Sequence, residues 1–397
     1  MSRKIASPAR AAVRACKVMR WAFLICIAFC GIAARAQTNW RNVVIGGGGF
    51  VTGTVFHPTE PGLVYARTDV GGAYRMDAST GGRWKPLNDE IGGLNNESQH
   101  LGVMTIGVDP SDANRVYVFT GQFAGPDGWK LPSRVYRSTD RGESWTYVTP
   151  GFKMMGNGEG RGTGERCAVN PVNGAIVLVG TSNDGIWRST DYGASWAKLP
   201  NFTAATNLNY VLYAPSSAPG PGPARRVYAS ANTLTAASLW YSDDNGDSWT
   251  AVPGQPGRVA GSEMFSLMGS FDAAGVFYSV WADQTGPGAY QSRFAVAKLS
   301  ANGATWTPIT PPGTWQGGFT GISADPRVAG HVVLTTIHRW NFPYDEVYRT
   351  TNGGSTWTGV LRNTGTTLST GNSPWASNGS PHWMTDVDID PFNSDRV

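Results

Sequence analysis

The stretch Ser138-Thr-Asp140-Arg-Gly142-Glu-Ser144-Trp145 follows the pattern Ser/Thr-x-Asp-x-Gly-x-Ser/Thr-Trp, and the 397-residue chain repeats this pattern. The other copies end at Trp84, Trp196, Trp249, Trp306 and Trp357. The copy ending at Trp357 has Asn352 in place of the aspartate. The copies ending at Trp84 and Trp306 depart further from the pattern but keep its glycine, as Gly81 and Gly303. The six tryptophans lie 61, 51, 53, 57 and 51 residues apart. Such a period predicts a repeat architecture.

This eight-residue repeat is known as the Asp-box, and its residue types fit a tight turn, here called a box turn. The aspartate accepts backbone N–H groups, the glycine takes a positive φ, and the tryptophan anchors the hairpin to the layer beneath. Gly residues number 51 of 397, well above the usual ~7%. The apolar segments are short, alternating and bounded by turn residues, which favours an all-β fold.

A second repeat runs in phase with the box turns and marks where strands begin. Its members precede short β-rich stretches: His57-Pro58, Asp109-Pro110, Asn170-Pro171, Ala214-Pro215, Asp272, Asp325-Pro326 and Asp390-Pro391. There are thus seven strand starts but six box turns. We predict a seven-bladed β-propeller, in which radial repetition protects the sheet edges, with the seventh blade incomplete in this chain.

Residues 1–36 differ from the rest and resemble a secretory signal peptide. A basic segment precedes an apolar run from Trp21 to Ala33, and Ala34-Arg35-Ala36 is a cleavage signal. The alternative is a membrane anchor, which is less favoured because the apolar run is short for a membrane span. No membrane association is expected after cleavage. Cys167 is the one cysteine after residue 36, which leaves no partner for an intrachain disulfide.

Removal of this segment changes the charge of the protein. It carries seven of the 32 Lys and Arg residues and none of the 28 Asp and Glu residues, so 25 basic residues remain and the net charge becomes −3. No basic patch points to a nucleic-acid partner. The five histidines lack metal-ligand spacing with a carboxylate, and no motif calls for a cofactor. A monomer is expected.

Propeller geometry predicts that Asp69 lies on the face opposite the box turns. Because the box turn joins the third and fourth strands of a blade, the loop between the second and third strands emerges on the opposite face. In the first unit that loop is Ala66-Arg-Thr-Asp-Val-Gly-Gly-Ala-Tyr-Arg75. The alternative interpretation is that Asp69 is an ordinary turn residue with glycine supplying a positive φ.

Several long motifs resemble glycoside hydrolase family 74, in the right order from residue 40 to residue 397. They are Asn42-Val-Val-Ile-Gly-Gly-Gly-Gly-Phe-Val-Thr-Gly53, Tyr65-Ala-Arg-Thr-Asp-Val-Gly-Gly-Ala-Tyr-Arg75, Gly160-Arg-Gly-Thr-Gly-Glu-Arg166, His382-Trp-Met384 and Ile389-Asp-Pro-Phe392. The resemblance implies an inverting β-1,4-glucanase that acts on xyloglucan, with two seven-bladed propellers and the substrate in the cleft between them.

The resemblance also implies how the catalytic carboxylates are divided. Inverting enzymes use one carboxyl group as general acid and a second carboxylate as general base. The first catalytic aspartate of the family maps to Asp69, which we expect to be the general base. The general acid belongs to a second Asp-Val-Gly-Gly motif, which would lie beyond Val397. Residues 37–397 are therefore expected to form an N-terminal propeller, with the second propeller missing and the fragment alone inactive.

Polysaccharide sites need aromatic platforms that stack on sugars and polar groups that bind hydroxyls. The tryptophans outside the box turns are candidates, with blade packing as the alternative: Trp129, Trp281, Trp315, Trp340, Trp375 and Trp383. Trp340 is the first choice because it lies in the loop between the second and third strands of the sixth repeat, on the same face as Asp69. Trp129, in a long loop, is the second choice. Arg339 and Arg67, which precede Trp340 and Thr68, are also assigned to substrate binding.

Two other functions stay open. One is a sialidase-like enzyme, which shares the Asp-box but needs an arginine cluster and a nucleophilic tyrosine, and the usual Arg-Ile-Pro opening is absent. The other is a non-catalytic propeller that binds glycans or proteins.

Overall fold

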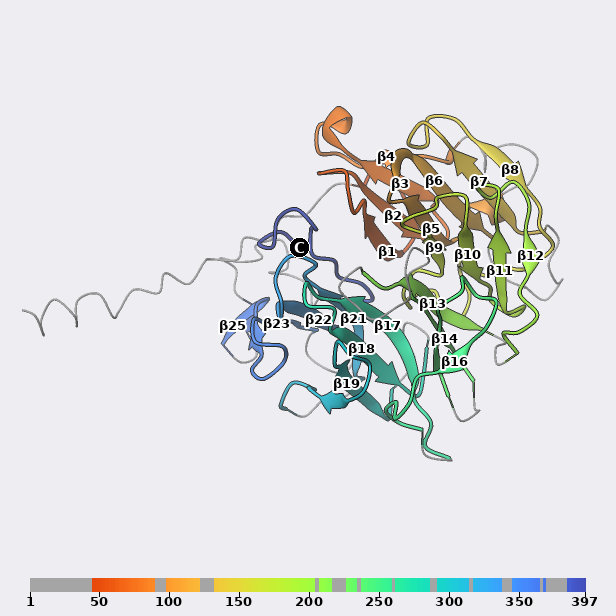
Figure 1. Ribbon diagram of the computed structural model, residues 1–397. Coiled ribbons are helices and arrows are strands. Elements are labelled where there is room, and N and C mark those ends of the chain that lie inside the picture. The colour runs from red at the N-terminus through yellow and green to blue at the C-terminus, as the bar shows by residue number, and fades with distance from the viewer. Residues whose placement is uncertain are drawn as a thin grey trace, which may run out of the picture. The chain divides into compact units, whose positions relative to one another are not determined.

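Six four-stranded antiparallel sheets follow one another along the chain in the computed structural model, and each is a simple meander (Figure 1). The structure describes residues 45–89, 98–121, 132–203, 207–215, 226–233, 237–258, 261–285, 291–313, 317–337, 345–364, 367–368 and 384–397. All of them belong to the unit Trp40–Val397.

The first three sheets cover the N-terminal half of the described residues. Their strands are β1 (Val51–Phe56), β2 (Val64–Thr68), β3 (Ala73–Met76) and β4 (Lys85–Pro86); β5 (Val103–Asp109), β6 (Asp112–Thr120), β7 (Arg134–Ser138) and β8 (Thr146–Val148); and β9 (Cys167–Val169), β10 (Val177–Gly180), β11 (Ile186–Ser189) and β12 (Ala197–Lys198). Two short 3-10 helices, η1 (Ala78–Thr80) and η2 (Ser98–Leu101), lie in the connections.

The next three sheets repeat the arrangement. Their strands are β13 (Leu208–Tyr213), β14 (Val227–Ala231), β15 (Leu239–Ser242) and β16 (Thr250–Ala251); β17 (Phe265–Phe271), β18 (Phe277–Ala282), β19 (Phe294–Leu299) and β20 (Trp306–Pro308); and β21 (Phe319–Ala324), β22 (Val332–Thr336), β23 (Val347–Thr350) and β24 (Thr358–Gly359). A small hairpin of β25 (Arg362–Thr364) and β26 (Thr367–Leu368) follows. The prediction of an all-β propeller is thus confirmed, with six blades among the described residues.

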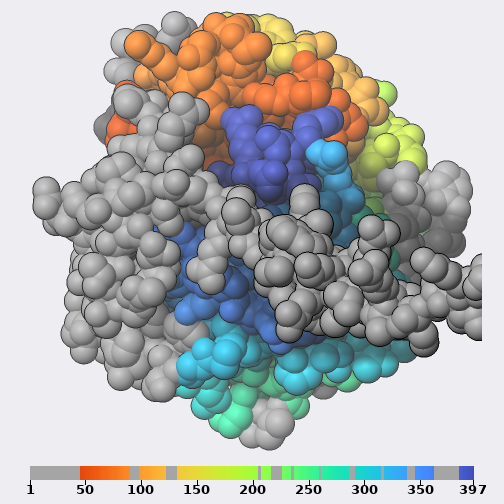
Figure 2. All heavy atoms as spheres, turned by 90° about the vertical axis from the view of Figure 1, so that its left-hand side faces the viewer, coloured from red at the N-terminus to blue at the C-terminus, as the bar shows by residue number. Residues whose placement is uncertain are grey.

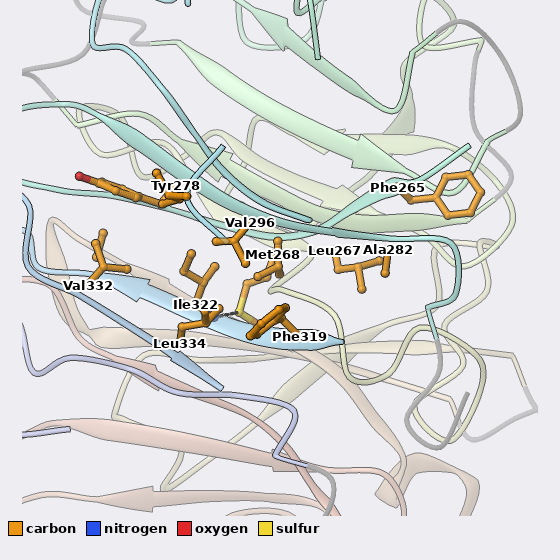
Figure 3. Packing of buried hydrophobic residues seen from close by; sticks show 13 residues of the cluster. Phe265, Leu267, Met268, Tyr278, Ala282, Val296, Phe319, Ile322, Val332 and Leu334 are labelled. Atoms are coloured by element: carbon orange, nitrogen blue, oxygen red, sulfur yellow. Dashed lines mark hydrogen bonds between the residues drawn. The ribbon is translucent and has the colours of Figure 1, made fainter. Parts of the chain in front are cut away.

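Neighbouring blades pack face to face, so strands such as β2 and β22 are buried at every residue instead of alternating. Figure 3 shows this between the fifth and sixth blades, where Tyr278, Val296 and Met268 face Ile322 and Leu334. The sulfur of Met268 also accepts the N–H of Ile322 at 3.3 Å. The core is therefore divided into layers, one between each pair of blades.

The box turns have the predicted geometry. In the second blade, Asp140 Oδ1 accepts the N–H of Ser144 at 2.9 Å and the hydroxyl of Ser138 at 2.6 Å, and Gly142 has a φ of 89°. Asp191 and Asp244 repeat these contacts. The sequence did not show that the residue before the glycine, Arg141 in this turn, also has a positive φ of 62°.

Three of the box tryptophans join their hairpins to the preceding blade by a hydrogen bond. The indole N–H of Trp145 donates to Leu87 O at 3.0 Å, that of Trp306 to Pro253 O at 3.1 Å, and that of Trp357 to Ile309 O at 2.7 Å. The anchoring role expected of the tryptophans is confirmed at these positions. For Trp281, blade packing rather than sugar stacking is the correct interpretation. Its side chain is fully buried in β18, with its ring edge-on to that of Trp306.

The first strand of every blade faces a central cavity of about 830 Å³. Residues 384–390 lie beside β1 and β21: Asp386 accepts the N–H of Thr54 at 2.5 Å, and Ile389 N–H donates to Ser323 Oγ at 3.1 Å. In Figure 2 the violet C-terminal residues accordingly lie next to the orange first blade. This segment ends in the turn found after the other first strands, since Asp390 N donates to Arg396 O at 3.0 Å just as Asp325 N donates to His331 O at 2.9 Å.

Candidate active site

The loop that carries Asp69 is a tight turn between β2 and β3. Thr68 fixes it, because its hydroxyl donates to Gly72 O at 2.9 Å and accepts the N–H of Gly71 at 2.8 Å. Gly72 has a φ of +92°, and a Cβ on Gly71 would lie 1.8 Å from Gly48 O. The two glycines after Asp69 are therefore required by backbone conformation and by close packing on the 46–49 glycine run.

The strand order places Asp69 on the face opposite the box turns. The β2–β3 loop and the β3–β4 turn lie at opposite ends of β3 because the sheet is an antiparallel meander. The residue is 8% exposed. Its Oδ1 accepts the N–H of Phe50 at 2.8 Å, and its own N–H donates to Phe50 O at 3.1 Å. One carboxylate oxygen is thus used to hold the start of β1.

The second oxygen of Asp69 has a different environment. Oδ2 lies 3.4 Å from Nε of Arg161, in the loop that leads into β9. The equivalent turn in the third blade, which Thr181 and Gly185 close in the same way, has Ser182 at the position of Asp69. Ser182 Oγ accepts the N–H of Met155 at 3.0 Å, so a single oxygen satisfies the structural role there. The Oδ2 atom of Asp69 is therefore in excess of what the turn needs.

Arg67, on β2 of the first blade, holds the loop that contains Arg161. Its side chain is almost completely buried, at 1% exposed. Its Nη1 donates to Arg161 O at 2.8 Å and to Thr52 Oγ1 at 2.8 Å, and its Nη2 donates to Thr163 O at 3.0 Å. Its Nε forms a charge-assisted hydrogen bond with Glu165. The substrate-binding role assigned to Arg67 stays a prediction, and the contacts show a side chain that is used inside the protein.

Glu165 connects the same Arg161 loop to β5 of the second blade. Its Oε2 accepts the hydroxyl of Thr105 at 2.5 Å and the N–H of Ile106 at 2.8 Å, while Oε1 faces Arg67. The motif Gly160-Arg-Gly-Thr-Gly-Glu-Arg166 therefore packs directly against the Arg67-Thr-Asp69 motif. Both carboxylate oxygens of Glu165 have donors inside the protein, so its contacts are those of a structural residue.

Two further carboxylates, Asp386 and Asp388, line the central cavity beside Thr54. The Thr54 hydroxyl lies 2.9 Å from Oδ2 of both. A hydroxyl has one proton to donate, so a carboxylic O–H must supply the other hydrogen bond. Burial raises the pKa of Asp386 and, with the negative charge of Asp386, raises the pKa of Asp388 well above its usual value. The two carboxyl groups therefore titrate as a pair, and the pair holds a proton more tightly than an isolated aspartate does.

The remaining predicted site residues, Trp340, Arg339 and Trp129, lie outside the described residues. Within the described part of the chain, no group of His, Cys, Asp and Glu residues is arranged to hold a metal ion. No helix among these residues is long and apolar enough to cross a membrane. Cys167 is a buried free thiol in β9.

Sequence reasoning missed Arg161 and Glu165 as neighbours of the Asp69 loop. The motif that contains them was available as a signal, since it stands out as a glycine-rich run with charged residues. Its spacing along the chain does not indicate which blade it contacts. That information comes from the three-dimensional fold, in which residues 161–165, just before β9, lie next to Arg67 of β2.

The chain and its fold are similar to glycoside hydrolase family 74 enzymes of known structure. A crystal structure of a glycoside hydrolase family 74 xyloglucanase from Xanthomonas campestris matches with a TM-score of 0.77 and 34% identity, covering 90% of this chain and 51% of that one. The family 74 enzyme of Niastella koreensis matches with a TM-score of 0.74 and 32% identity over 89% and 51% of the two chains.

Curated sequences give the same result. A xyloglucanase of Acetivibrio thermocellus is 35% identical over 92% of this chain and 47% of that protein, and a xyloglucanase of Hypocrea jecorina is 33% identical over 92% and 48%. No protein-family model matches the chain. The chain spans about half the length of the curated relatives it matches. It is a homologue of the glycoside hydrolase family 74 xyloglucanases over that half, which confirms the resemblance seen in the motifs.

Proposed function

We propose that this chain is the N-terminal propeller of a secreted glycoside hydrolase that cleaves β-1,4-glucosidic bonds of xyloglucan with inversion. Asp69 is the general base in this proposal, and residues after Val397 in the complete protein supply the general acid. The support comes from the relatives, which are named as xyloglucanases, and from the placement of Asp69.

The observation that carries the proposal is the second oxygen of Asp69. The residue at this turn position needs one side-chain acceptor for a backbone N–H: Ser182 Oγ accepts that of Met155, and Asp69 Oδ1 accepts that of Phe50. Oδ2 of Asp69 takes no part in this contact. Its charged contact among the described residues is Arg161, not another carboxylate. The proposed inversion requires the acid to stand ~6.5–9.5 Å from this base, so that a water molecule fits between base and sugar.

The proposal has three further parts. Residues 1–36 are a signal peptide, so the mature protein begins at Gln37 outside the cell. Residues 384–397 begin a seventh blade, since they repeat the strand-and-turn contacts of the other first strands. Trp340, Trp129 and Arg339 bind the glucan, with the indole rings stacked on sugar faces.

Product stereochemistry tests the reaction class. The complete protein would be incubated with xyloglucan oligosaccharides, and the anomeric protons of the first products followed by NMR before mutarotation. Inversion of a β-linkage predicts that the α-anomer appears first. Initial release of the β-anomer would contradict the assignment of Asp69 as a base, and tight binding without new reducing ends would favour a non-catalytic glycan-binding propeller. N-terminal sequencing of exported material tests cleavage after Ala36.

A further inference from the structure

The turn that carries Asp69 does not require the Oδ2 atom of its carboxylate. The guanidinium of Arg161 lies next to this atom. We propose that Arg161 is a positioning residue for Asp69, whose guanidinium fixes the orientation of the carboxylate that activates water. This inference rests on the proposed function, because it assigns Arg161 a role in the same reaction. Phe50 fixes one oxygen of the carboxylate and Arg161 fixes the other.

The position of Arg161 is itself fixed by its own backbone. Its N–H donates to Gly158 O at 3.3 Å, and its O accepts Nη1 of Arg67 at 2.8 Å. Its guanidinium Nη1 donates to Gly158 O at 3.2 Å, and Gly160 before it has a φ of +78°. The Arg161 side chain therefore emerges from a closed turn rather than from a freely moving loop.

Arg67 and Glu165 hold this turn in register with Asp69. Arg67 lies two residues before Asp69 on β2, and its buried guanidinium binds Arg161 O, Thr163 O and Glu165. A shift of the turn would break all three contacts at once. The same arginine thus fixes the strand that ends at Asp69 and the turn that carries Arg161, so the two charged groups are held at a set distance.

The distance itself fits a positioning role. At 3.4 Å, Nε of Arg161 and Oδ2 of Asp69 are farther apart than an ordinary N–H···O hydrogen bond of 2.7–3.2 Å. The cation fixes the direction of the carboxylate, while Oδ2 keeps lone pairs for a water molecule. A base locked in a short bidentate pair with arginine would lack such a site.

The test uses Arg161→Gln and Arg161→Lys in the complete protein, with xyloglucan oligosaccharides as substrate. Arg161→Gln is expected to lower kcat by about 10–100-fold, because small misplacement of a catalytic group costs up to ~10²-fold. KM is expected to stay within about twofold, and Arg161→Lys should recover most of the loss. In an Asp69→Asn background, Arg161→Gln should cause no further loss.

Arg188→Gln is the matched control. The Arg188 side chain is 24% exposed against 23% for Arg161, and it pairs with Asp247 of a box turn, on the face away from Asp69. Its activity should equal that of the wild type. A raised KM with unchanged kcat in Arg161→Gln would overturn the inference, since Arg161 would then contact the glucan instead of positioning Asp69.

A second measurement separates this inference from the proposed function. Urea unfolding of the wild type, Asp69→Asn, Arg161→Gln and the double variant forms a double-mutant cycle that needs no activity. Non-additive shifts of the unfolding midpoint support the contact even if xyloglucan is not hydrolysed, an outcome that would refute the proposed function alone. Additive shifts would overturn the inference even in an active enzyme.

Discussion

Arg161 lies in the loop that leads into β9, and its Nε lies 3.4 Å from Oδ2 of Asp69 in the loop after β2, on the face opposite the box turns. The pair exists because Arg67 binds the backbone of Arg161 and the side chain of Glu165 from the strand that ends at Asp69. The candidate site is therefore a property of the assembled ring, and its integrity depends on buried contacts behind it.

The Arg67–Glu165 pair should be important for stability. Glu165→Gln removes the charge that compensates Arg67, which is 1% exposed. Removal of one partner of a buried ion pair typically costs about 3–5 kcal/mol, so we expect a loss of that size in the free energy of unfolding. Asp243→Asn is the control, because its partner Arg226 is in a more open pair and the change should cost about 1 kcal/mol or less. Equal effects in chemical denaturation would contradict the account.

The coupled titration of Asp386 and Asp388 predicts a pH dependence of stability. Because the pKa of Asp388 is raised by burial and by the charge of Asp386, the folded state holds its proton more tightly than the unfolded state. Stability from this pair is therefore full below the unfolded value of about 3.9 and falls as the pH rises through the higher folded value.

Asp388→Asn should remove this loss, since an amide N–H donates to Thr54 as the protonated carboxyl does. We expect a higher thermal midpoint than the wild type at neutral pH and a flatter profile between pH 4 and pH 8, measured by calorimetry. Asp395→Asn, at a side chain that is 84% exposed, should leave the profile unchanged. A lower midpoint for Asp388→Asn at neutral pH would show that both carboxylates are ionised there.

The box turns make a prediction about asparagine. Hydrogen bonds from Ser138, from Ser144 and from the backbone outweigh burial and lower the pKa of Asp140 to about 2. Asp140→Ala loses these bonds and should cost about 1–3 kcal/mol. Asp140→Asn should cost less, because Asn352 already accepts the N–H of Thr356 at 2.9 Å in the sixth blade. Denaturant titrations that rank asparagine with alanine would count against this turn chemistry.

Local patterns predicted much of the fold. The box turns and the in-phase strand starts located all six described blades, because each blade is built from contacts close in sequence. The resemblance also directed attention to Asp69. The role of Arg67 behind the site was not predictable in this way, since its partners at residues 161–165 lie two blades further along the chain. Burial of Trp281 was open for a similar reason, as tryptophan occurs both in cores and on platforms.

The assignment of Asp69 as general base is tested most directly by Asp69→Asn in the complete protein, with the release of reducing ends from xyloglucan as the measurement. Asparagine retains an acceptor for Phe50 but cannot take a proton from water, and general-base assistance contributes ~10²–10⁴-fold. We predict a loss of turnover of that size, with binding of the polymer retained. Near-normal turnover by Asp69→Asn would contradict the account and place the base elsewhere.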